Sequence, residues 1–297
     1  MTEAPTAAPG WYPDPASPTL QRYWNGVEWT ESTAPLVMQP FAPVAASPPG
    51  SVETPGGYAP PQGRWGLGDV GWLVLVVVGS LLLGVVAGVV ALGLDSDVFT
   101  PDGTLDLGIA TGAWLAVVSQ GIVMAGLAGW PMVVAAWKGP GWRRAFGFVA
   151  SGRALWVGIV GGIATFLTLV ILTAVASVVF GQTIDSAAAD LVVDMESQTV
   201  AYAIFLVFIA FGAPFVEEMA FRGLLWGAIV KRGWSPWVAT VLSGVAFGLF
   251  HFEPLRLVPL IAAGVVLGFV RHKAGLGASM VAHCVVNSIG VISLLAA

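Results

Sequence analysis

The fold is decided by one long apolar run, AYAIFLVFIAFGAPFVEEMAFRGLLWGAIVK, at residues 201–231. It exceeds the roughly 20 apolar residues that a helix needs to cross a bilayer. The run nevertheless carries Glu217, Glu218 and Arg222, although a charge at the bilayer centre costs roughly 2.5–3.5 kcal/mol. Because such residues usually face one another around a water-filled cavity, the run predicts a membrane helix that lines a functional site.

The composition places the whole chain in the same class. Of its 297 residues, 57% are hydrophobic and only 10% are charged, whereas a soluble domain carries about 25% charged residues. The net charge of −5 and the lack of a basic stripe argue against nucleic acid as a partner. The single cysteine, Cys284, excludes an intrachain disulfide and a cysteine-rich metal site. We therefore expect an all-α, polytopic transmembrane helical bundle embedded in the lipid bilayer.

The distribution of apolar residues divides the chain into three regions. Residues 1–32 form a small, aromatic, tryptophan-containing module, and residues 33–64 are rich in Pro, Ala and Gly, which is typical of a disordered linker. Residues 65–297 form the membrane domain. Seven spans are predicted in it, at 69–94, 109–137, 154–180, 200–230, 236–252, 256–271 and 275–296.

The loop charges predict how the domain is oriented. Basic residues follow spans two, four and six, and include Lys138, Arg143, Arg144, Lys231, Arg232, Arg271 and Lys273. Since such residues favour the cytoplasmic side, we expect a multi-pass protein of the inner (plasma) membrane with its N-terminus in the cytoplasm. The acidic loops at 95–106 and 185–196 are expected outside. Helical rise places Glu217 and His283 roughly 15–20 Å inside the cytoplasmic ends, which is compatible with a cytoplasm-facing opening.

The charged motif at 217–222 indicates different roles for its two carboxylates. Residues four apart lie nearly in line on a helix, so Glu218 and Arg222 are expected to form an ion pair. Glu217 points elsewhere, and a carboxylate without this partner suits a general base. Pro214 lacks an N–H and frees the carbonyl of Ala210, which weakens the helix where the acids begin. The alternative that Glu218 and Arg222 only hold helices together stays open.

Two other segments repeat the spacing of four residues. Phe247 and His251 share one helix face, and so do His283 and Asn287. The Phe247 ring can therefore buttress the imidazole of His251. The side chains of His283 and Asn287 can both donate hydrogen bonds into one cavity.

Small, aromatic and charged residues near the span ends predict further contacts. Gly244 and Gly248 are four apart beside His251 and predict a close approach of two helices. Trp65 is expected to be an interfacial anchor. Glu253 and Arg256 are expected to form a pair at the membrane interface.

Three short motifs together resemble those of a known protein family. Glu-Glu-x-x-x-Arg at 217–222, Phe-x-x-x-His at 247–251 and His-x-x-x-Asn at 283–287 occur in this order on hydrophobic segments. Over about residues 150–297 the chain resembles the CAAX-protease and bacteriocin-processing family of intramembrane proteases, relatives of the Ras-converting endopeptidase. The runs Trp-Tyr-Pro-Asp-Pro (11–15) and Arg-Tyr-Trp-Asn-Gly (22–26) are similar to a short actinobacterial module of unknown function, whose partner is unknown.

The resemblance implies an endopeptidase that hydrolyses a peptide bond in a peptide or protein substrate at the membrane. Glu217 and His251 would activate a water molecule for attack on the peptide carbonyl. His283 and Asn287 would stabilise the oxyanion, and a donor of that kind is worth about 100- to 1,000-fold in rate.

The resemblance also bears on supporting residues and on a metal. Glu218 and Arg222 would hold the site or orient the substrate. The family is traditionally labelled a metalloprotease, and Glu217, His251 and His283 could supply three ligands to zinc. Because the His-Glu-x-x-His pattern is absent and a metal-free glutamate mechanism uses the same residues, the sequence leaves zinc open.

Two alternatives come from other functional classes. A non-catalytic membrane immunity factor or scaffold would retain the site without using it, and would tolerate Glu217→Gln. A carboxylate-dependent transporter would need Glu217 as a titrating group, but not His283 and Asn287 at donor spacing.

Overall fold

A computed structural model describes residues 9–17, 19–35, 60–94, 109–184 and 199–296. The chain divides into two compact units, Met1–Val52 and Glu53–Ala297. The two acidic loops that were predicted outside the membrane lie beyond the described residues, as does most of the predicted linker.

The N-terminal unit is a three-stranded antiparallel sheet of β1 (Gly10–Pro13), β2 (Leu20–Trp24) and β3 (Trp29–Pro35). Trp24 is buried, and its ring meets that of Trp29 edge-on at a centroid distance of 5.3 Å. Arg22 Nη2 lies 3.1 Å from Asp14 Oδ2, and this hydrogen bond holds the pKa of Asp14 below its usual range. Strand β3 runs to Pro35, into the segment that the sequence assigned to the linker.

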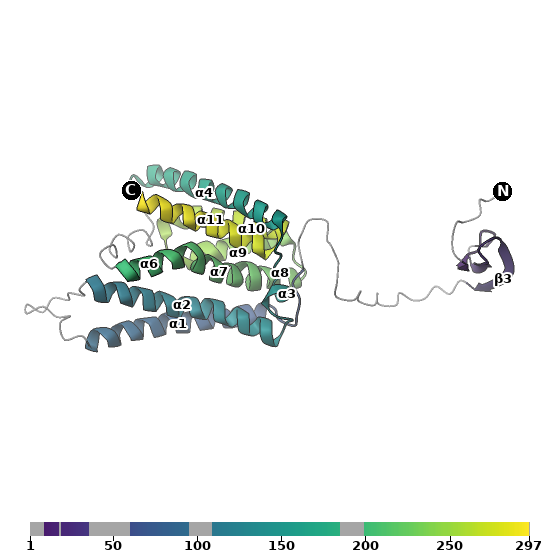
Figure 1. Cartoon of the computed structure of the whole chain (residues 1–297), viewed down its shortest axis with the longest axis horizontal. Helices are drawn as coiled ribbons and strands as arrows, with labels where there is room; N and C mark the ends of the chain where they lie inside the picture. Colours follow the sequence, from purple (N-terminus) through teal and green to yellow (C-terminus); the bar gives the residue numbers. More distant parts are fainter. Residues whose placement is uncertain (1–8, 18, 36–59, 95–108, 185–198, 297) are drawn as a thin grey trace, which may run out of the picture. The chain divides into compact units, whose positions relative to one another are not determined.

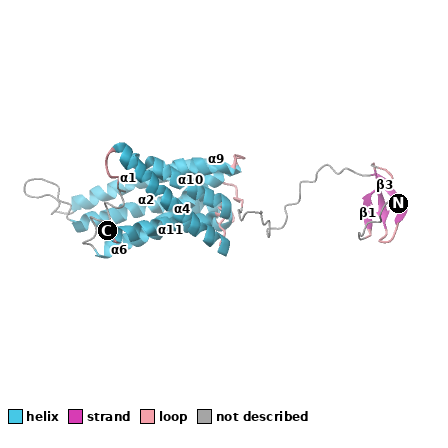
Figure 2. Ribbon diagram, turned by 90° about the horizontal axis from the view of Figure 1, so that it is seen from above, coloured by secondary structure: helices cyan, strands magenta, loops and turns pink. Residues whose placement is uncertain are grey.

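The second unit is a helical bundle whose long helices lie side by side (Figures 1 and 2). Its elements are α1 (Leu67–Leu94), α2 (Ile109–Trp137), α3 (Trp142–Ala145), α4 (Gly152–Phe180), α6 (Thr199–Val207), π-helix η1 (Phe208–Gly212), α7 (Ala213–Glu217), π-helix η2 (Glu218–Leu225), α8 (Trp226–Lys231), α9 (Pro236–Phe250), 3₁₀-helix η3 (Pro254–Arg256), α10 (Leu257–Ala274) and α11 (Leu276–Leu295).

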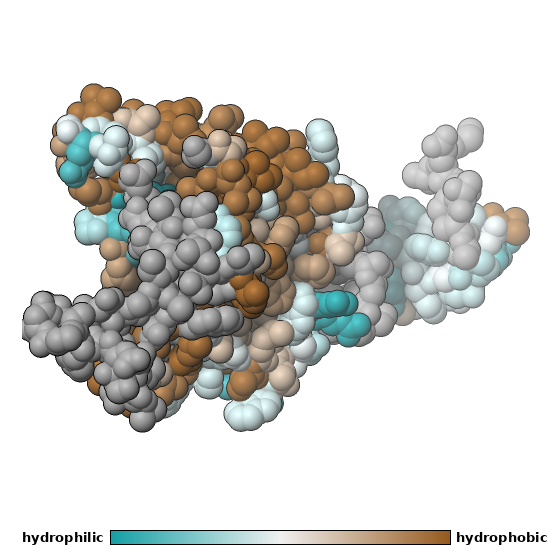
Figure 3. Space-filling model, turned by 60° about the vertical axis from the view of Figure 1, so that its left-hand side comes forward, coloured by the Kyte–Doolittle hydropathy of each residue, from teal (hydrophilic) through white to brown (hydrophobic). Residues whose placement is uncertain are grey.

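The helical, membrane-spanning character predicted from the sequence is confirmed. Among the described residues, 6 helical segments are long and apolar enough to cross a membrane, and Tyr202–Lys231, which joins α6 to α8, is one of them. Helix α9 corresponds to the fifth predicted span, but it is shorter than the others. Large apolar side chains are exposed along α1 and α4, including Val85 and Ile171, and Figure 3 shows such side chains covering much of one face. An exposed apolar surface of this kind suits contact with lipid.

The basic loop residues gather at one end of this bundle, where α2, α8 and α10 end and α1, α4 and α11 begin (Figure 1). Lys231 Nζ donates to the carbonyl of Trp65 at 2.6 Å and lies 4.1 Å from the centroid of its ring. The Trp65 ring also meets Phe146 edge-on, and only 3% of Trp65 is exposed. The prediction of Trp65 as an interfacial anchor is therefore wrong, because the segment before α1 folds back onto the bundle.

Glycines allow α9 and α10 to approach closely, as the Gly244/Gly248 spacing predicted. A Cβ atom added to Gly264 would lie 2.8 Å from Gly244 Cα, and one added to Gly248 would lie 2.9 Å from the backbone nitrogen of Ile261. No side chain fits between these backbones, and this contact positions the end of α9 beside α10.

Candidate functional site

The fourth predicted span changes its helical register around the acidic motif. Glu217 is the last residue of α7, which lies between π-helices η1 and η2. In η1 the N–H of Ala213 donates to the carbonyl of Phe208, five residues earlier. Short π-helical segments inside α-helices are rare and occur frequently at functional sites. The wider turn here adjoins Pro214, which cannot continue the backbone hydrogen bonds.

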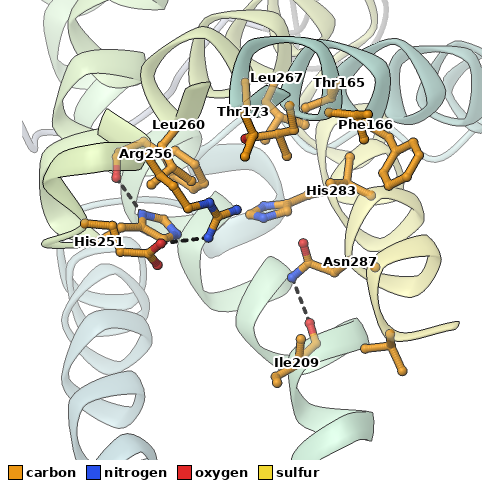
Figure 4. Close-up of a pocket in the computed structure, with 18 of the residues that line it drawn as sticks. Thr165, Phe166, Thr173, Ile209, His251, Arg256, Leu260, Leu267, His283 and Asn287 are labelled. Atoms are coloured by element: carbon orange, nitrogen blue, oxygen red, sulfur yellow. Dashed lines mark hydrogen bonds and ion pairs between the residues drawn. The ribbon is translucent and has the colours of Figure 1, made fainter. Parts of the chain in front are cut away.

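Asn287 on α11 compensates for that proline. In the register of η1, the residue due to donate to the carbonyl of Ile209 would be Pro214, which has no N–H. Asn287 Nδ2 donates to this carbonyl instead, at 2.8 Å (Figure 4). We expected Pro214 to act on Ala210, one turn away in an α-helix; the π-register shifts the effect to Ile209. One N–H of the Asn287 amide is thus already used, which the spacing of the sequence could not predict.

Glu218 is the centre of a buried polar network. Its Oε1 lies 3.0 Å from Arg222 Nη1, as the spacing of four predicted, and 3.1 Å from His283 Nδ1. The hydroxyl of Ser279 donates to Oε2. Neither Glu218 nor Arg222 is exposed at all. Ser279 was not predicted to belong to the site, although it precedes His283 by four residues and so shares its helix face.

Arg222 joins this network to the packing of three helices. Its Nη2 donates to the carbonyl of Gly264 at 2.8 Å, and its Cζ lies 4.5 Å from the centroid of the Phe247 ring. Arg271 was predicted to lie in a cytoplasmic loop, but it is fully buried at the end of α10. Its side chain donates to the carbonyls of Arg222 and Phe146, at 3.2 and 2.6 Å. Arg271 therefore supports the backbone of the acidic motif.

His283 links the two carboxylates. Because the Glu218 carboxylate accepts from His283 Nδ1, this nitrogen carries a hydrogen, and the opposite nitrogen, Nε2, lies 3.7 Å from Glu217 Oε2. Glu217 was expected to lack a charged partner, but the fold places it beside the imidazole of His283 from α11. When His283 is protonated, the charges of Glu217, Glu218, Arg222 and His283 sum to zero, which lowers the penalty for burying them.

His251 is held in one orientation at the end of α9. Its Nδ1 lies 2.8 Å from the carbonyl of Phe247. A carbonyl only accepts, so this nitrogen carries the hydrogen and Nε2 of the neutral ring keeps its lone pair. The rings of Phe247 and His251 have centroids 4.6 Å apart, so Phe247 packs beside the imidazole as the spacing of four residues predicted.

One cavity of about 620 Å³ brings the predicted residues together (Figure 4). Its lining includes Glu217 from α7, Phe247 and His251 from the end of α9, and His283 and Asn287 from α11. Glu218 and Arg222 lie outside that lining; Glu218 contacts His283 directly, and Arg222 contacts Glu218. The fold thus separates a set of groups that can meet a ligand from a buried set that positions them.

The cavity lies mainly in the half of the bundle away from the end where the basic loop residues gather. Helix α11 begins at the basic end, yet its lining residues run from His283 to Leu294; α4 contributes Thr165 to Thr173. The lining also includes Glu253 and Arg256, beyond the end of α9. A cavity opening toward the basic end was compatible with the sequence, but the lining residues extend toward the opposite end.

The arrangement does not fit the zinc ligands that the sequence left open. Within the described residues, no group of three or more His, Cys, Asp or Glu side chains could hold a metal ion. Glu217, His251 and His283 line the same cavity without forming such a group. We therefore derive no catalytic step through a metal.

Comparisons with known proteins agree with both resemblances. Residues 199–289 match the family model described as type II CAAX prenyl endopeptidase Rce1-like, and residues 9–47 match a protein of unknown function (DUF2510). The first match contains all three motifs. No curated protein and no solved structure matches the chain. The match to the Rce1-like model and the apolar helices support a hydrolase of the protease class in a multi-pass membrane protein.

Proposed function

Starting from this Rce1-like domain, we propose that the chain is an intramembrane endopeptidase that cleaves a peptide bond with an activated water molecule. The observation that carries the proposal is the single cavity that Glu217, His251, His283 and Asn287 line together. Its volume of about 620 Å³ lies within the range of roughly 300–1,000 Å³ for ligand pockets. A short extended segment of peptide is a suitable occupant.

Glu217 and His251 are both acceptors for the attacking water. The carboxylate of Glu217 and the Nε2 lone pair of His251 each accept one hydrogen of the same water molecule. As the water oxygen attacks the peptide carbonyl carbon, Glu217 takes the proton and becomes a carboxylic acid. General base catalysis of this kind contributes about 100- to 10,000-fold in rate.

His283 and Asn287 receive the negative charge that develops on the carbonyl oxygen. Glu218 accepts from His283 Nδ1 and thereby stabilises the imidazolium, whose Nε2–H can donate to the oxyanion. Asn287 donates one N–H to Ile209, and its second N–H is the other proposed donor. When the C–N bond breaks, the leaving amine takes the proton from Glu217, which restores the carboxylate and gives one acid and one amine product.

The predicted orientation of the helices indicates on which side of the membrane the cavity lies. If the basic end is cytoplasmic, as the loop charges favour, the cavity lies in the outer half of the membrane. We therefore place the enzyme in the inner (plasma) membrane, with its N-terminal module in the cytoplasm and its substrate entering from the outer half of the bilayer.

The proposal is tested by Glu217→Gln, which keeps the shape of the side chain and removes the base. Quantitative membrane proteomics of cells carrying either form should reveal a precursor that accumulates in the variant, with its processing slowed by at least about 100-fold. Glu28→Gln, on the exposed surface of the N-terminal module, is the matched control. An unchanged proteome would favour the scaffold. A phenotype in Glu217→Gln that His283→Ala and Asn287→Ala both lack would favour the transporter.

A further inference from the structure

Glu253 and Arg256 form a charged pair on the cavity lining, and the proposed chemistry does not use it. Arg256 Nη1 donates to Glu253 Oε2 at 2.7 Å, and the two side chains are only 16% and 17% exposed. We expected this pair at the membrane interface, but both residues line the same cavity as Glu217. Arg256 is the one Lys or Arg side chain among the described lining residues.

The turn that carries Arg256 is a strained one. Helix α9 ends at Phe250, and Phe252 has a φ of 54°, the one positive φ of a non-glycine residue in the described chain. That conformation is uncommon for a bulky residue and persists only where the surroundings enforce it. The turn leads directly into η3, which carries Arg256. Figure 4 shows Arg256 among the residues of the cavity that His251 and His283 also line.

Folding stability alone does not explain why an ion pair is present at this place. Replacing a buried ion pair by apolar residues is often neutral or stabilising, because two charges lose their hydration. A guanidinium offers five N–H donors in a planar fork, and the fork matches a carboxylate through two parallel hydrogen bonds. Glu253 engages Nη1 and so orients the fork. A cation held in this way beside the proposed reacting groups is suited to binding an anionic part of the substrate.

We propose that Arg256, positioned by Glu253, binds a carboxylate of the substrate inside the cavity. The proposal rests on the endopeptidase function, since it makes the substrate a peptide with a carboxylate close to the scissile bond. That carboxylate is either the α-carboxylate of a chain end or the side chain of Asp or Glu. Both present the same two oxygens to Arg256, and the experiment distinguishes them.

The experiment measures binding rather than cleavage. Full-length Glu217→Gln protein, purified in detergent, is titrated with three peptides: acetyl-tetraalanine with a free carboxylate, the same peptide as its C-terminal amide, and acetyl-Ala-Glu-Ala-amide. Hydrogen bonds to charged groups lead us to expect the free acid to bind at least about 10-fold more tightly than the amide. Tight binding of the third peptide identifies a side-chain carboxylate as an acceptable source.

Three variants and one control variant in the same background assign the effect to Arg256. Arg256→Gln should abolish the preference for the acid, and Arg256→Lys, which keeps the charge without the fork, should retain only part of it. Glu253→Gln should weaken the preference by loosening the fork. Arg144→Gln, on the exposed surface at the basic end, should leave the preference unchanged.

The proposal is overturned if Arg256→Gln keeps the full preference for the acid, or if the protein with Arg256 intact binds acid and amide equally or binds neither. A separate cleavage assay with Glu217 intact tests the endopeptidase. Carboxylate binding without any cleavage would refute the endopeptidase, whereas cleavage without a preference for the acid would refute only the role of Arg256.

Discussion

Replacing Glu218 by glutamine tests whether the buried network holds the site together. The substitution keeps the size of the side chain and one carbonyl oxygen, but it removes the negative charge that Arg222, His283 and Ser279 share. Arg222 is then left fully buried with its charge uncompensated by the residue beside it. We expect a large loss of folding stability even though no atom of Glu218 lines the cavity.

The expected magnitude follows from this burial. Removing one partner of a buried ion pair costs about 3–5 kcal/mol, a large share of the roughly 5–15 kcal/mol by which proteins are stable. We therefore expect Glu218→Gln and Arg222→Met each to lower the free energy of unfolding by about 3–5 kcal/mol. The double variant lacks both charges, so its loss should fall short of the sum by about 1–3 kcal/mol.

The assay is reversible unfolding of the purified protein in mixed micelles of detergent and dodecyl sulfate, followed for the wild type, the two single variants and the double variant. Arg222→Lys is the control that keeps the charge while it alters the bond to the Gly264 carbonyl. Losses below about 1 kcal/mol for both single variants, or losses that add to within about 0.5 kcal/mol, would refute the reasoning. Either result would mean that the Glu218 and Arg222 charges contribute little interaction energy to the folded state.

Two further predictions concern the helix contact and the N-terminal module. Gly264→Ala should lower the free energy of unfolding by about 1–3 kcal/mol, because its Cβ would lie 2.8 Å from Gly244 Cα; Gly88→Ala, with nothing within 4 Å, should cause no loss in the same micelle assay. The Arg22 hydrogen bond lowers the pKa of Asp14 from its ordinary 3.8, so the module should be stabilised above about pH 4 and lose that stability as the pH falls through the folded-state pKa. Near-ultraviolet circular dichroism of a fragment of residues 1–52 should show this acid transition in the wild type and a weaker pH dependence in Asp14→Asn; equal pH profiles would contradict the assignment.

The spacing of residues along one helix was sufficient to predict contacts between side chains of that helix. The Glu218–Arg222 ion pair and the Phe247–His251 ring contact both follow from a spacing of four residues, and the structure contains both. The close approach at Gly244 also followed from local spacing, because a small residue exposes its own backbone. The same rules failed for Trp65, because the residues that enclose it, Phe146 just after α3 and Lys231 at the end of α8, are distant from it along the chain.

Other parts of the site required contacts between distant segments. The bond from Asn287 to Ile209 depends on a π-register that no spacing of apolar residues predicts. The link from Glu218 to His283 joins residues that are 65 positions apart. Arg256 lines the cavity and follows the turn at Phe252, whose positive φ no residue pattern predicted.

The sequence by itself determined that this protein crosses the membrane and which polar side chains enter it, because hydrophobic run length and the cost of charge in lipid act on each segment independently. Only the tertiary structure decided which of those side chains meet, which half of the bundle holds the cavity, and which carboxylate is buried behind it. Those outcomes depend on how the helices pack against one another, and helix packing is a property of several segments at once.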